Sequence, residues 1–325
     1  MKGYTIVTGG AGFIGANVIK RLNELGEDKI LLVDNLSKSE KWKNLIDLNF
    51  EDYIHKDRFI GDIKNEKFNG LVKTIIHLGA RSSTTEQDVD FLMVNNYEYT
   101  KELAKWSLKN NVRFIYASSA ATYGDGSNGF SDDHKLLPLL RPLNAYGYSK
   151  HLFDLWALKK GILDKIVGLK YFNVFGPREW HKGEMRSMVL KAYEQIKKDG
   201  RIRLFKSYHP NYKDGEQLRD FIYVKDAVDM TLFFLEKPDI HGIFNIGTGI
   251  PRSWNDLAKA VFESLRMSPQ IEYIDMPEQI REKYQYFTQA DMKKLRNIGY
   301  NKPTLSLEEA VKDYIVEYLE KFKTL

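Results

Sequence analysis

The feature that most constrains this chain is a glycine-rich loop near its start. The loop 8–15, Thr-Gly-Gly-Ala-Gly-Phe-Ile-Gly, directly follows the strand-like run 4–8 and opens the segment 13–25, whose apolar residues recur at helical spacing. Glycines there let the backbone turn sharply and approach a pyrophosphate, whose charge is met by the helix N-terminus. Asp34 ends the next strand-like run, 29–34, where an acidic group can accept hydrogen bonds from an adenosine ribose. The loop therefore predicts a dinucleotide-binding site.

The N-terminal half repeats this alternation of short apolar runs and amphipathic segments. Runs that are apolar throughout, such as 30–33, are typical of strands buried on both faces. The pattern predicts an α/β fold of the Rossmann type, with a doubly wound parallel sheet. Further strands are expected at 59–61, 74–78, 112–117 and 166–171, and helices at 89–108 and 145–160.

After about Asn173 the alternation becomes less regular, and loop signals separate short segments. Strands are expected at 202–205, 221–224 and 271–274. We interpret this part as a smaller α/β lobe that binds the substrate. The predicted dinucleotide-binding domain comprises 1–172 with returning segments at about 219–250 and 303–325, and the predicted substrate-binding lobe comprises about 173–218 and 251–302.

Composition excludes several classes of function. The chain of 325 residues has no cysteine, which rules out disulfides, thiolate metal sites and a cysteine nucleophile, and its seven histidines show no metal-binding spacing, so no metal is expected. The net charge of +5 suits an anionic ligand, although a surface with a slight excess of lysine would give the same value. No basic block suggests nucleic acid. Without a signal-peptide core or an apolar run of about 18 residues, no membrane partner is expected and the predicted location is the cytoplasm.

A second motif, Tyr146-Gly147-Tyr148-Ser149-Lys150, follows Ser118-Ser119 at the end of an expected strand. Because residues four apart share a helix face, the Lys150 ammonium can stabilise the Tyr146 phenolate and lower a pKa of about 10 toward the working pH. Tyrosine can then exchange a proton with a substrate alcohol, while the Ser119 hydroxyl holds the reacting oxygen. Tyr148 has no lysine four residues later, because residue 152 is leucine, so it lacks this arrangement. The motif predicts oxidation and reduction of an alcohol, with Tyr146, Lys150 and Ser119 as catalytic residues.

Together with the blocks 116–124 and 171–179, these motifs make the chain resemble the extended short-chain dehydrogenases. The stretches 44–49, 82–86, 181–183 and 287–291 are similar to the ADP-L-glycero-D-manno-heptose 6-epimerases. The similarity extends over nearly the whole chain. The resemblance implies an isomerase that serves lipopolysaccharide core heptose synthesis, binds an ADP-heptose and forms a homo-oligomer. A bound nicotinamide would take a hydride from carbon six, giving a transient ketone, and return it to the opposite face.

Because the nicotinamide is fixed, the ketone must present both faces, and each orientation needs its own proton donor and acceptor. The resemblance pairs Tyr146 with Lys182 for this purpose. Lysine can act so only if burial or a neighbouring cation lowers its pKa. Taken without the resemblance, Lys182 would be a solvated loop lysine.

The resemblance also implies the residues that surround the ligands. The cofactor is expected to contact Gly9, Gly12, Phe13, Ile14, Gly15, Asp34, Asn35, Lys41, Lys56, Leu78, Gly79, Ala80, Arg81, Ser82, Asn95, Lys150, Val174 and Lys182. The nucleotide sugar is expected to contact Asn173, Glu184, Lys191, Phe205, Lys206, Ser207, Tyr208, Arg219 and Tyr284. Arginine at position 219 suits a contact with the diphosphate, because a guanidinium can bind phosphate oxygens bidentately. The alternative interpretation of Arg219 is a surface salt bridge.

The choice between NADP and NAD stays open in the residues. Asp34 favours a free 2′-hydroxyl because it would repel a 2′-phosphate, whereas Lys38 and Lys41 could neutralise that phosphate. The resemblance favours NADP.

The chain also departs from the pattern of these epimerases. Glu184 stands in place of a small residue, Lys191 in place of histidine and Arg81 in place of a smaller side chain, and the loop 205–214 is longer. A UDP-hexose 4-epimerase, which would not need Lys182, is the main alternative. A 4,6-dehydratase is disfavoured because Ala120-Ala121 stands where its acidic pair belongs. A non-catalytic dinucleotide-binding sensor is disfavoured by the three catalytic residues described above.

Overall fold

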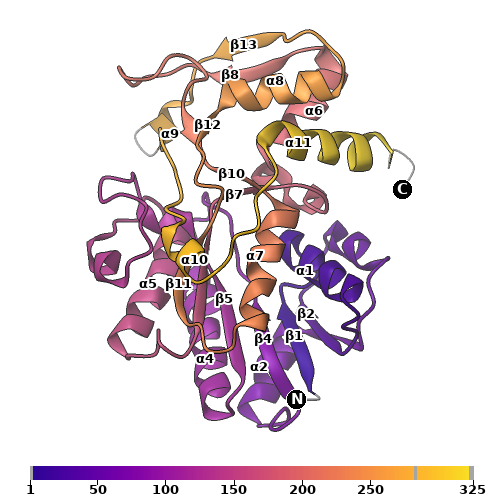
Figure 1. Ribbon diagram of the computed structural model, residues 1–325, viewed down its shortest axis with the longest axis vertical. Coiled ribbons are helices and arrows are strands. Elements are labelled where there is room, and N and C mark those ends of the chain that lie inside the picture. Colours follow the sequence, from indigo (N-terminus) through magenta and orange to yellow (C-terminus); the bar gives the residue numbers. More distant parts are fainter. Residues whose placement is uncertain (1–2, 282–283, 322–325) are drawn as a thin grey trace.

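Seven parallel strands form the central sheet of the computed structural model, which describes residues 3–281 and 284–321. Residues 1–2, 282–283 and 322–325, which the predicted domain limits include, lie outside the described residues. The strand order β11-β6-β5-β4-β1-β2-β3 confirms the doubly wound fold (Figure 1). The order reverses between β1 and β4, and ligands bind at such a switch point, beyond the carboxyl ends of the strands. The strands are β1 (Tyr4–Thr8), β2 (Ile30–Asp34), β3 (Asp52–His55), β4 (Val72–His77), β5 (Arg113–Ser119), β6 (Val167–Tyr171) and β11 (Gly242–Ile246).

Helices cover both faces of this sheet, which explains why its strands are apolar throughout. Alternate residues of β1 belong to different cores: Ile6 packs with Phe59 and Leu103, whereas Val7 packs with Val18 and Ile19. The covering elements are α1 (Phe13–Glu24), α2 (Lys56–Lys64), α3 (Val89–Leu92), the π-helical segment η2 (Met93–Glu98), α4 (Tyr99–Lys109), α5 (Ala145–Lys159) and α7 (Val224–Glu236).

The strand predicted at 59–61 is wrong, because these residues lie inside α2. Phe59 and Ile63 are one helical turn apart and both buried, so the short apolar run is one face of a helix. The His55 ring accepts a hydrogen bond from the Asp57 amide and caps this helix. The strand instead ends at His55, since β3 spans Asp52–His55.

The helix expected at 89–108 forms, but with a π-helical segment in its middle. The segment η2 carries Asn95 and Asn96, and the Asn96 side chain bonds both the amide and the carbonyl of Arg81 at 2.9 and 3.0 Å. Its Nδ2 also donates to the Ser149 hydroxyl at 3.0 Å. This irregular turn therefore fastens the loop after β4 to α5, and π-turns are often found at functional sites.

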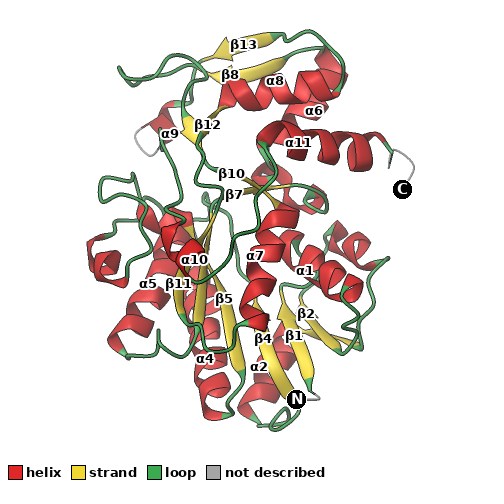
Figure 2. Ribbon diagram, viewed as in Figure 1, coloured by secondary structure: helices red, strands yellow, loops and turns green. Residues whose placement is uncertain are grey.

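Three small sheets build the part at the top of Figure 1, opposite the N-terminus. Figure 2 shows β8 and β13 at the upper edge of the molecule, with α8 beneath them. In this part α6 and α8 pack together, and α11, which belongs to the segment 303–325 assigned to the dinucleotide-binding domain, packs on α8 and β10. The strand pairs are β7 (Asn173–Phe175) with β10 (Phe221–Tyr223), β9 (Leu218–Arg219) with β12 (Arg252–Ser253), and β8 (Ile202–Phe205) with β13 (Ile271–Ile274). The helices of this part are α6 (Met188–Asp199), α8 (Trp254–Ser264), α9 (Glu278–Arg281) and α11 (Leu307–Lys312), continued by the π-helical η6 (Asp313–Glu320), whereas α10 (Lys293–Asn297) packs against β11 of the central sheet.

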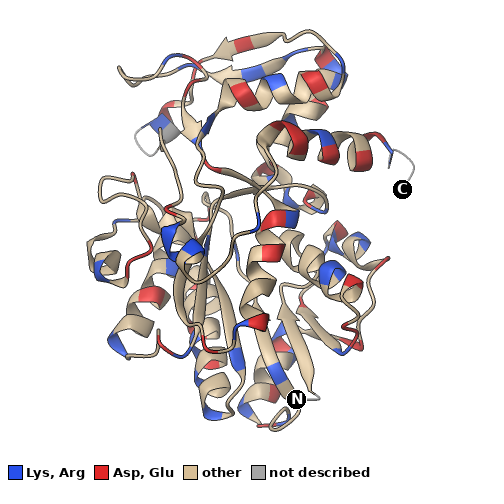
Figure 3. Cartoon of the chain, in the orientation of Figure 1, with Lys and Arg blue, Asp and Glu red and all other residues tan. Residues whose placement is uncertain are grey.

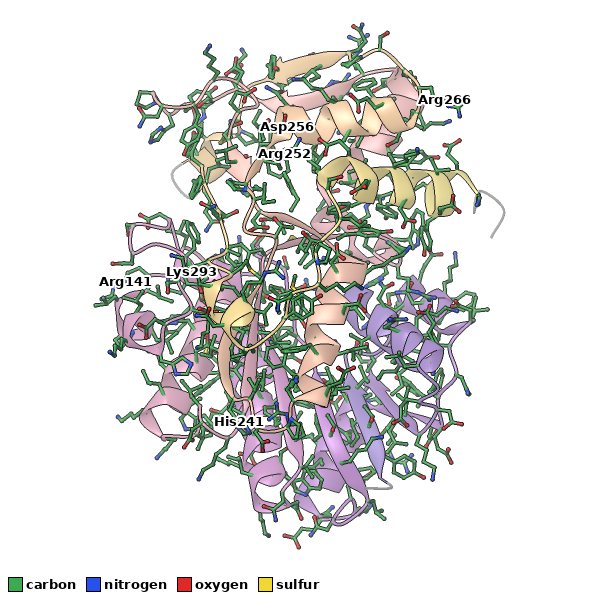
Figure 4. All side chains as sticks on the ribbon, in the orientation of Figure 1. Arg141, His241, Arg252, Asp256, Arg266 and Lys293 are labelled. Atoms are coloured by element: carbon green, nitrogen blue, oxygen red, sulfur yellow. The ribbon has the colours of Figure 1, made fainter. Side chains whose placement is uncertain are left out.

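An ion-pair network fastens α11 to this upper part. The Arg252 guanidinium contacts Asp256 at 3.2 Å and Glu308 at 2.5 Å, and Figure 4 shows Arg252 and Asp256 side by side at the start of α8. Elsewhere, basic and acidic residues are interspersed along the chain (Figure 3). Over the ranges 3–281 and 284–321, no helix combines the length and apolarity that a bilayer crossing requires.

Candidate active site

A cavity of about 950 Å³ opens beyond the carboxyl ends of the central strands, where a doubly wound fold places its ligand. This volume suits a large organic ligand. Its wall includes every residue predicted to contact the cofactor, and also Tyr146 and Ser119. Of the residues predicted to contact the substrate, Asn173, Glu184 and Lys191 line it.

The glycine loop has the geometry that a pyrophosphate requires. Gly9 has a φ of +69°, and a Cβ there would lie 2.6 Å from the Gly79 amide nitrogen. A Cβ on Gly15 would lie 2.1 Å from the Gly9 carbonyl oxygen, so only glycine fits. Helix α1 starts after Gly12 without a side-chain cap, so its first amides have no partner within the helix. The loop therefore fits a dinucleotide phosphate.

Asp34, at the end of β2, is already paired. Its Oδ1 accepts from the Lys41 ammonium at 2.6 Å, and its Oδ2 accepts from the Ala11 amide at 3.0 Å. Lys38 is exposed and lies outside the cavity wall, which includes Lys41. Lys38 and Lys41 are therefore not equivalent, because only Lys41 lines the cavity and pairs with Asp34.

Helix α5 places Tyr146 and Lys150 one turn apart on the cavity wall. Its start is capped by the Asn144 side chain, which accepts from the Gly147 amide at 2.8 Å. The Lys150 ammonium donates to the Ala117 carbonyl at 2.8 Å, and burial lowers its pKa to about 8. Burial raises the pKa of Tyr146, opposed by its hydrogen bond with Ser119. The pKa of Tyr146 is therefore raised by burial, opposite to the lowering expected from Lys150, whose ammonium donates to the Ala117 carbonyl.

Lys182 reaches the same cavity from a different element. It lies in the short helical segment η5 (Trp180–Met185), and its ammonium lies 5.2 Å from the centre of the Phe13 ring. The side chain is half-buried, which lowers the pKa of Lys182, and the Glu179 carboxylate opposes this shift. Glu179 is fully buried and accepts from the Ser187 hydroxyl at 2.7 Å. Lys182 is therefore a desolvated amine rather than a solvated loop lysine, as an acid–base role requires.

The remaining predicted substrate contacts lie outside the cavity wall. Arg219 is buried behind it, with its guanidinium carbon 5.6 Å from the Trp254 ring centre and 5.1 Å from the Tyr284 ring centre. The guanidinium donates to the carbonyls of Leu218 and Gln285. Because the side chain is buried, Arg219 does not form the surface salt bridge that was the alternative. Trp254 and Gln285 line the cavity, whereas Arg219 and Tyr284 form the layer beneath.

The segment 205–208, also predicted to contact the substrate, is drawn away from the cavity by Asp275. This carboxylate accepts from the Tyr208 hydroxyl at 2.8 Å and pairs with Lys206 at 3.2 Å. The Arg281 guanidinium lies over the Tyr208 ring at 4.0 Å. Phe205 ends β8, and the Ser207 amide donates to Asp214 at 2.7 Å. The pairing of Phe205 with Ile274, at the ends of β8 and β13, brings Lys206 next to Asp275.

Sequence reasoning missed a buried ion pair beneath the predicted catalytic residues. Lys170 and Asp154 are both fully buried, with 2.7 Å between Nζ and Oδ2. Asp154 also accepts from the Tyr116 hydroxyl and the Ser118 hydroxyl, each at 2.8 Å. Asp154 lies one turn after Lys150 on α5, which was the available signal. The pair supports the strand end that carries Ser119.

We expect Lys170→Met to lower the free energy of unfolding by about 3–5 kcal/mol, because it leaves the Asp154 carboxylate buried without its counter-charge. Equilibrium urea unfolding measures this loss. The double variant Lys170→Met with Asp154→Leu should be more stable than the single one, since no buried charge remains. A single variant within 1 kcal/mol (roughly the worth of an exposed pair) of the parent would contradict this account.

The comparisons with known proteins agree with this geometry. Residues 5–247 match the NAD dependent epimerase/dehydratase family. The chain belongs to this family. A protein of Nitratidesulfovibrio vulgaris named ADP-L-glycero-D-manno-heptose-6-epimerase is 54% identical over 97% of each chain, and one of Fusobacterium nucleatum with the same name is 49% identical over 97% of this chain and 98% of its own.

Solved structures show that the fold alone does not separate the activities within the family. The Helicobacter pylori ADP-L-glycero-D-manno-heptose-6-epimerase matches with a TM-score of 0.79 and 29% identity, covering 97% of this chain and 96% of its own. The UDP-N-acetylglucosamine 4-epimerase of Methanobrevibacter ruminantium matches with a TM-score of 0.81 and 25% identity, covering 99% and 100%. The family membership confirms the resemblance found in the sequence.

Proposed function

We propose that this protein inverts carbon six of the heptose in an ADP-glycero-manno-heptose, a precursor of the lipopolysaccharide core, by transient oxidation to a ketone and reduction of its opposite face. The observation that carries this proposal is the convergence of two acid–base side chains, Tyr146 from α5 and Lys182 from η5, on one dinucleotide cavity. The 54% identity to a named ADP-heptose epimerase supports the same substrate.

The residues of the chain have distinct roles in this proposal. A bound oxidised nicotinamide supplies a hydride acceptor and a positive charge. The glycine loop holds the pyrophosphate, Tyr146 takes the proton of the substrate alcohol, and Ser119 holds that oxygen. The Lys150 ammonium favours the phenolate form of Tyr146 when both face the bound ligands. Lys182 exchanges the proton when the other face of the ketone is reduced.

Interconversion of the two ADP-heptose epimers by the purified protein, followed by NMR of the sugar, tests the proposal. We expect one epimer to be converted to the equilibrium mixture without net consumption of cofactor. UDP-glucose and UDP-galactose are the comparison substrates. Interconversion of these hexoses with no change in the ADP-heptoses would overturn the proposal in favour of a 4-epimerase, and no conversion of either would favour a dinucleotide-binding sensor.

We also propose that NADP is the preferred cofactor; the pairing of Lys41 with Asp34 and the place of Lys41 on the cavity wall support this. Lys41→Met should weaken NADP binding about ten-fold or more while leaving NAD binding nearly unchanged, since Asp34 would then face the phosphate alone. The two dissociation constants are measured by titrating cofactor-free protein. Lys38→Met, which removes an exposed lysine, is the matched control. Equal weakening of both cofactors would contradict the assignment.

A further inference from the structure

A group of hydrogen bonds ties together two segments on either side of the glycine loop, and the proposed chemistry does not use them. The Arg178 guanidinium donates to both carboxylate oxygens of Asp47 at 2.7 Å and to the Asn44 carbonyl at 2.5 Å. In the opposite direction, the Asn44 amide donates to the Arg178 carbonyl at 3.1 Å. Nη2 of Arg178 makes both contacts with Asp47 and Nη1 makes the contact with Asn44, so the two segments are joined reciprocally through charge-assisted hydrogen bonds.

The same asparagine also reaches the glycine loop. Its amide donates to the Ala11 carbonyl at 3.0 Å, and the side chain is buried, with 4% of its surface exposed. Its Nδ2 also lies 3.3 Å from Nδ1 of His181, the residue next to Lys182. Burial lowers the pKa of His181 to about 4, so its ring is neutral near pH 7 and can accept this hydrogen bond. One buried amide thus contacts the glycine loop and both ends of the turn before Lys182.

Arg178 adopts a backbone conformation that needs such support. Its φ is +76°, in the left-handed region that non-glycine residues rarely occupy. Residues in such conformations persist where the surrounding contacts hold them. Here those contacts are the bonds to Asn44 and Asp47, and the chain continues from Arg178 into η5, which carries Lys182.

We propose that Asn44, Asp47 and Arg178 are positioning residues that hold η5 against the glycine loop and so keep the Lys182 ammonium over the Phe13 ring, facing the cavity. We refer to these three residues as the clamp. The catalytic part of this inference rests on the proposed function. The placement of Lys182 by the clamp does not, so the two can be tested separately.

The variant Arg178→Gly removes the guanidinium and preserves the backbone, because glycine adopts a φ of +76° without strain. The matched control is Lys20→Met. Lys20 is the other basic partner of Asp47, at 3.3 Å. Neither Lys20 nor Asp47 lines the cavity. Asp47→Asn is the second clamp variant. It replaces a half-exposed side chain and keeps its shape, so it tests the clamp even if Arg178→Gly folds poorly.

The first measurement needs no substrate. Lys182 in the cofactor-bound protein is acetylated with an amine-reactive reagent, and mass spectrometry gives its labelling rate relative to that of exposed Lys198. We expect both clamp variants to label Lys182 several-fold faster than the parent, since a released η5 exposes the amine, and Lys20→Met to label it at the parent rate. Unchanged labelling in both clamp variants would overturn the proposal.

The second measurement is a double-mutant cycle on epimer interconversion. We expect Arg178→Gly to lower turnover by about ten-fold or more in the parent and by less than about three-fold in a Lys182→Met background, because the clamp acts through Lys182. A purely structural residue would lower turnover by the same factor in both backgrounds, and that result would overturn the positioning role. If Lys182→Met itself keeps full activity, the proposed two-base function fails while the labelling result still decides whether the clamp places Lys182.

Discussion

Tyr146→Phe is expected to lose about a hundred- to ten-thousand-fold in turnover while the nucleotide sugar binds nearly normally, because general acid–base groups contribute on this scale. The ring stays in its half-buried position at the N-terminal end of α5, and only the hydroxyl that bonds Ser119 is removed. The rate of ADP-heptose epimer interconversion gives the loss in turnover. Equilibrium binding of ADP-heptose gives the affinity.

The matched control for this change is Tyr148→Phe, two residues along the same helix. Tyr148 is 47% exposed and does not line the cavity, so the same chemical change there should leave turnover within about two-fold. If Tyr146→Phe keeps turnover within a few-fold of the parent, Tyr146 does not exchange the proton. If its substrate affinity falls in parallel with its turnover, the hydroxyl serves binding instead.

Lys182→Met is expected to damage epimerisation as severely. Methionine keeps the length and the apolar contact with the Phe13 ring but lacks the charge and the exchangeable proton. Inversion needs oxidation in one orientation and reduction in the other, so the loss of either base stops the cycle. The double variant with Tyr146→Phe should therefore be little slower than the slower single variant.

The two orientations can also be observed separately. With Lys182 removed, Tyr146 should still allow one of the two epimers to reduce the bound cofactor, and the near-ultraviolet absorbance of the reduced nicotinamide reports this step. Lys198→Met, which removes an exposed lysine near the end of α6, is the control for the loss of a lysine away from the cavity wall. A Lys182 variant that retains turnover within a few-fold, or a double variant whose loss is the product of the two single losses, would exclude the two-base mechanism and favour a 4-epimerase.

Local patterns in the sequence were sufficient for the fold and for half of the candidate site. The glycine loop, the apolar strands and the Tyr146–Lys150 register each depend on residues within one or two turns of each other, and the structure places all of them on one cavity wall. The one strand that was wrongly predicted, 59–61, fails for the same reason: three apolar residues fit both a strand and one face of α2.

Only the tertiary structure decided the features that depend on residues distant in the chain. Lys182 is partly desolvated because η5 folds back onto Phe13. Lys41 forms an ion pair with Asp34, and Arg219 lies behind Trp254 instead of on the cavity wall. Burial and pairing of this kind depend on which segments meet after folding, and residue spacing carries no information about that. The sequence by itself therefore determined the α/β architecture, the dinucleotide loop and the Tyr146 face of the chemistry. The lowered pKa of Lys182, and the hydrogen bonds that join its segment to the glycine loop, required the packed chain, because desolvation and long-range hydrogen bonds exist only there.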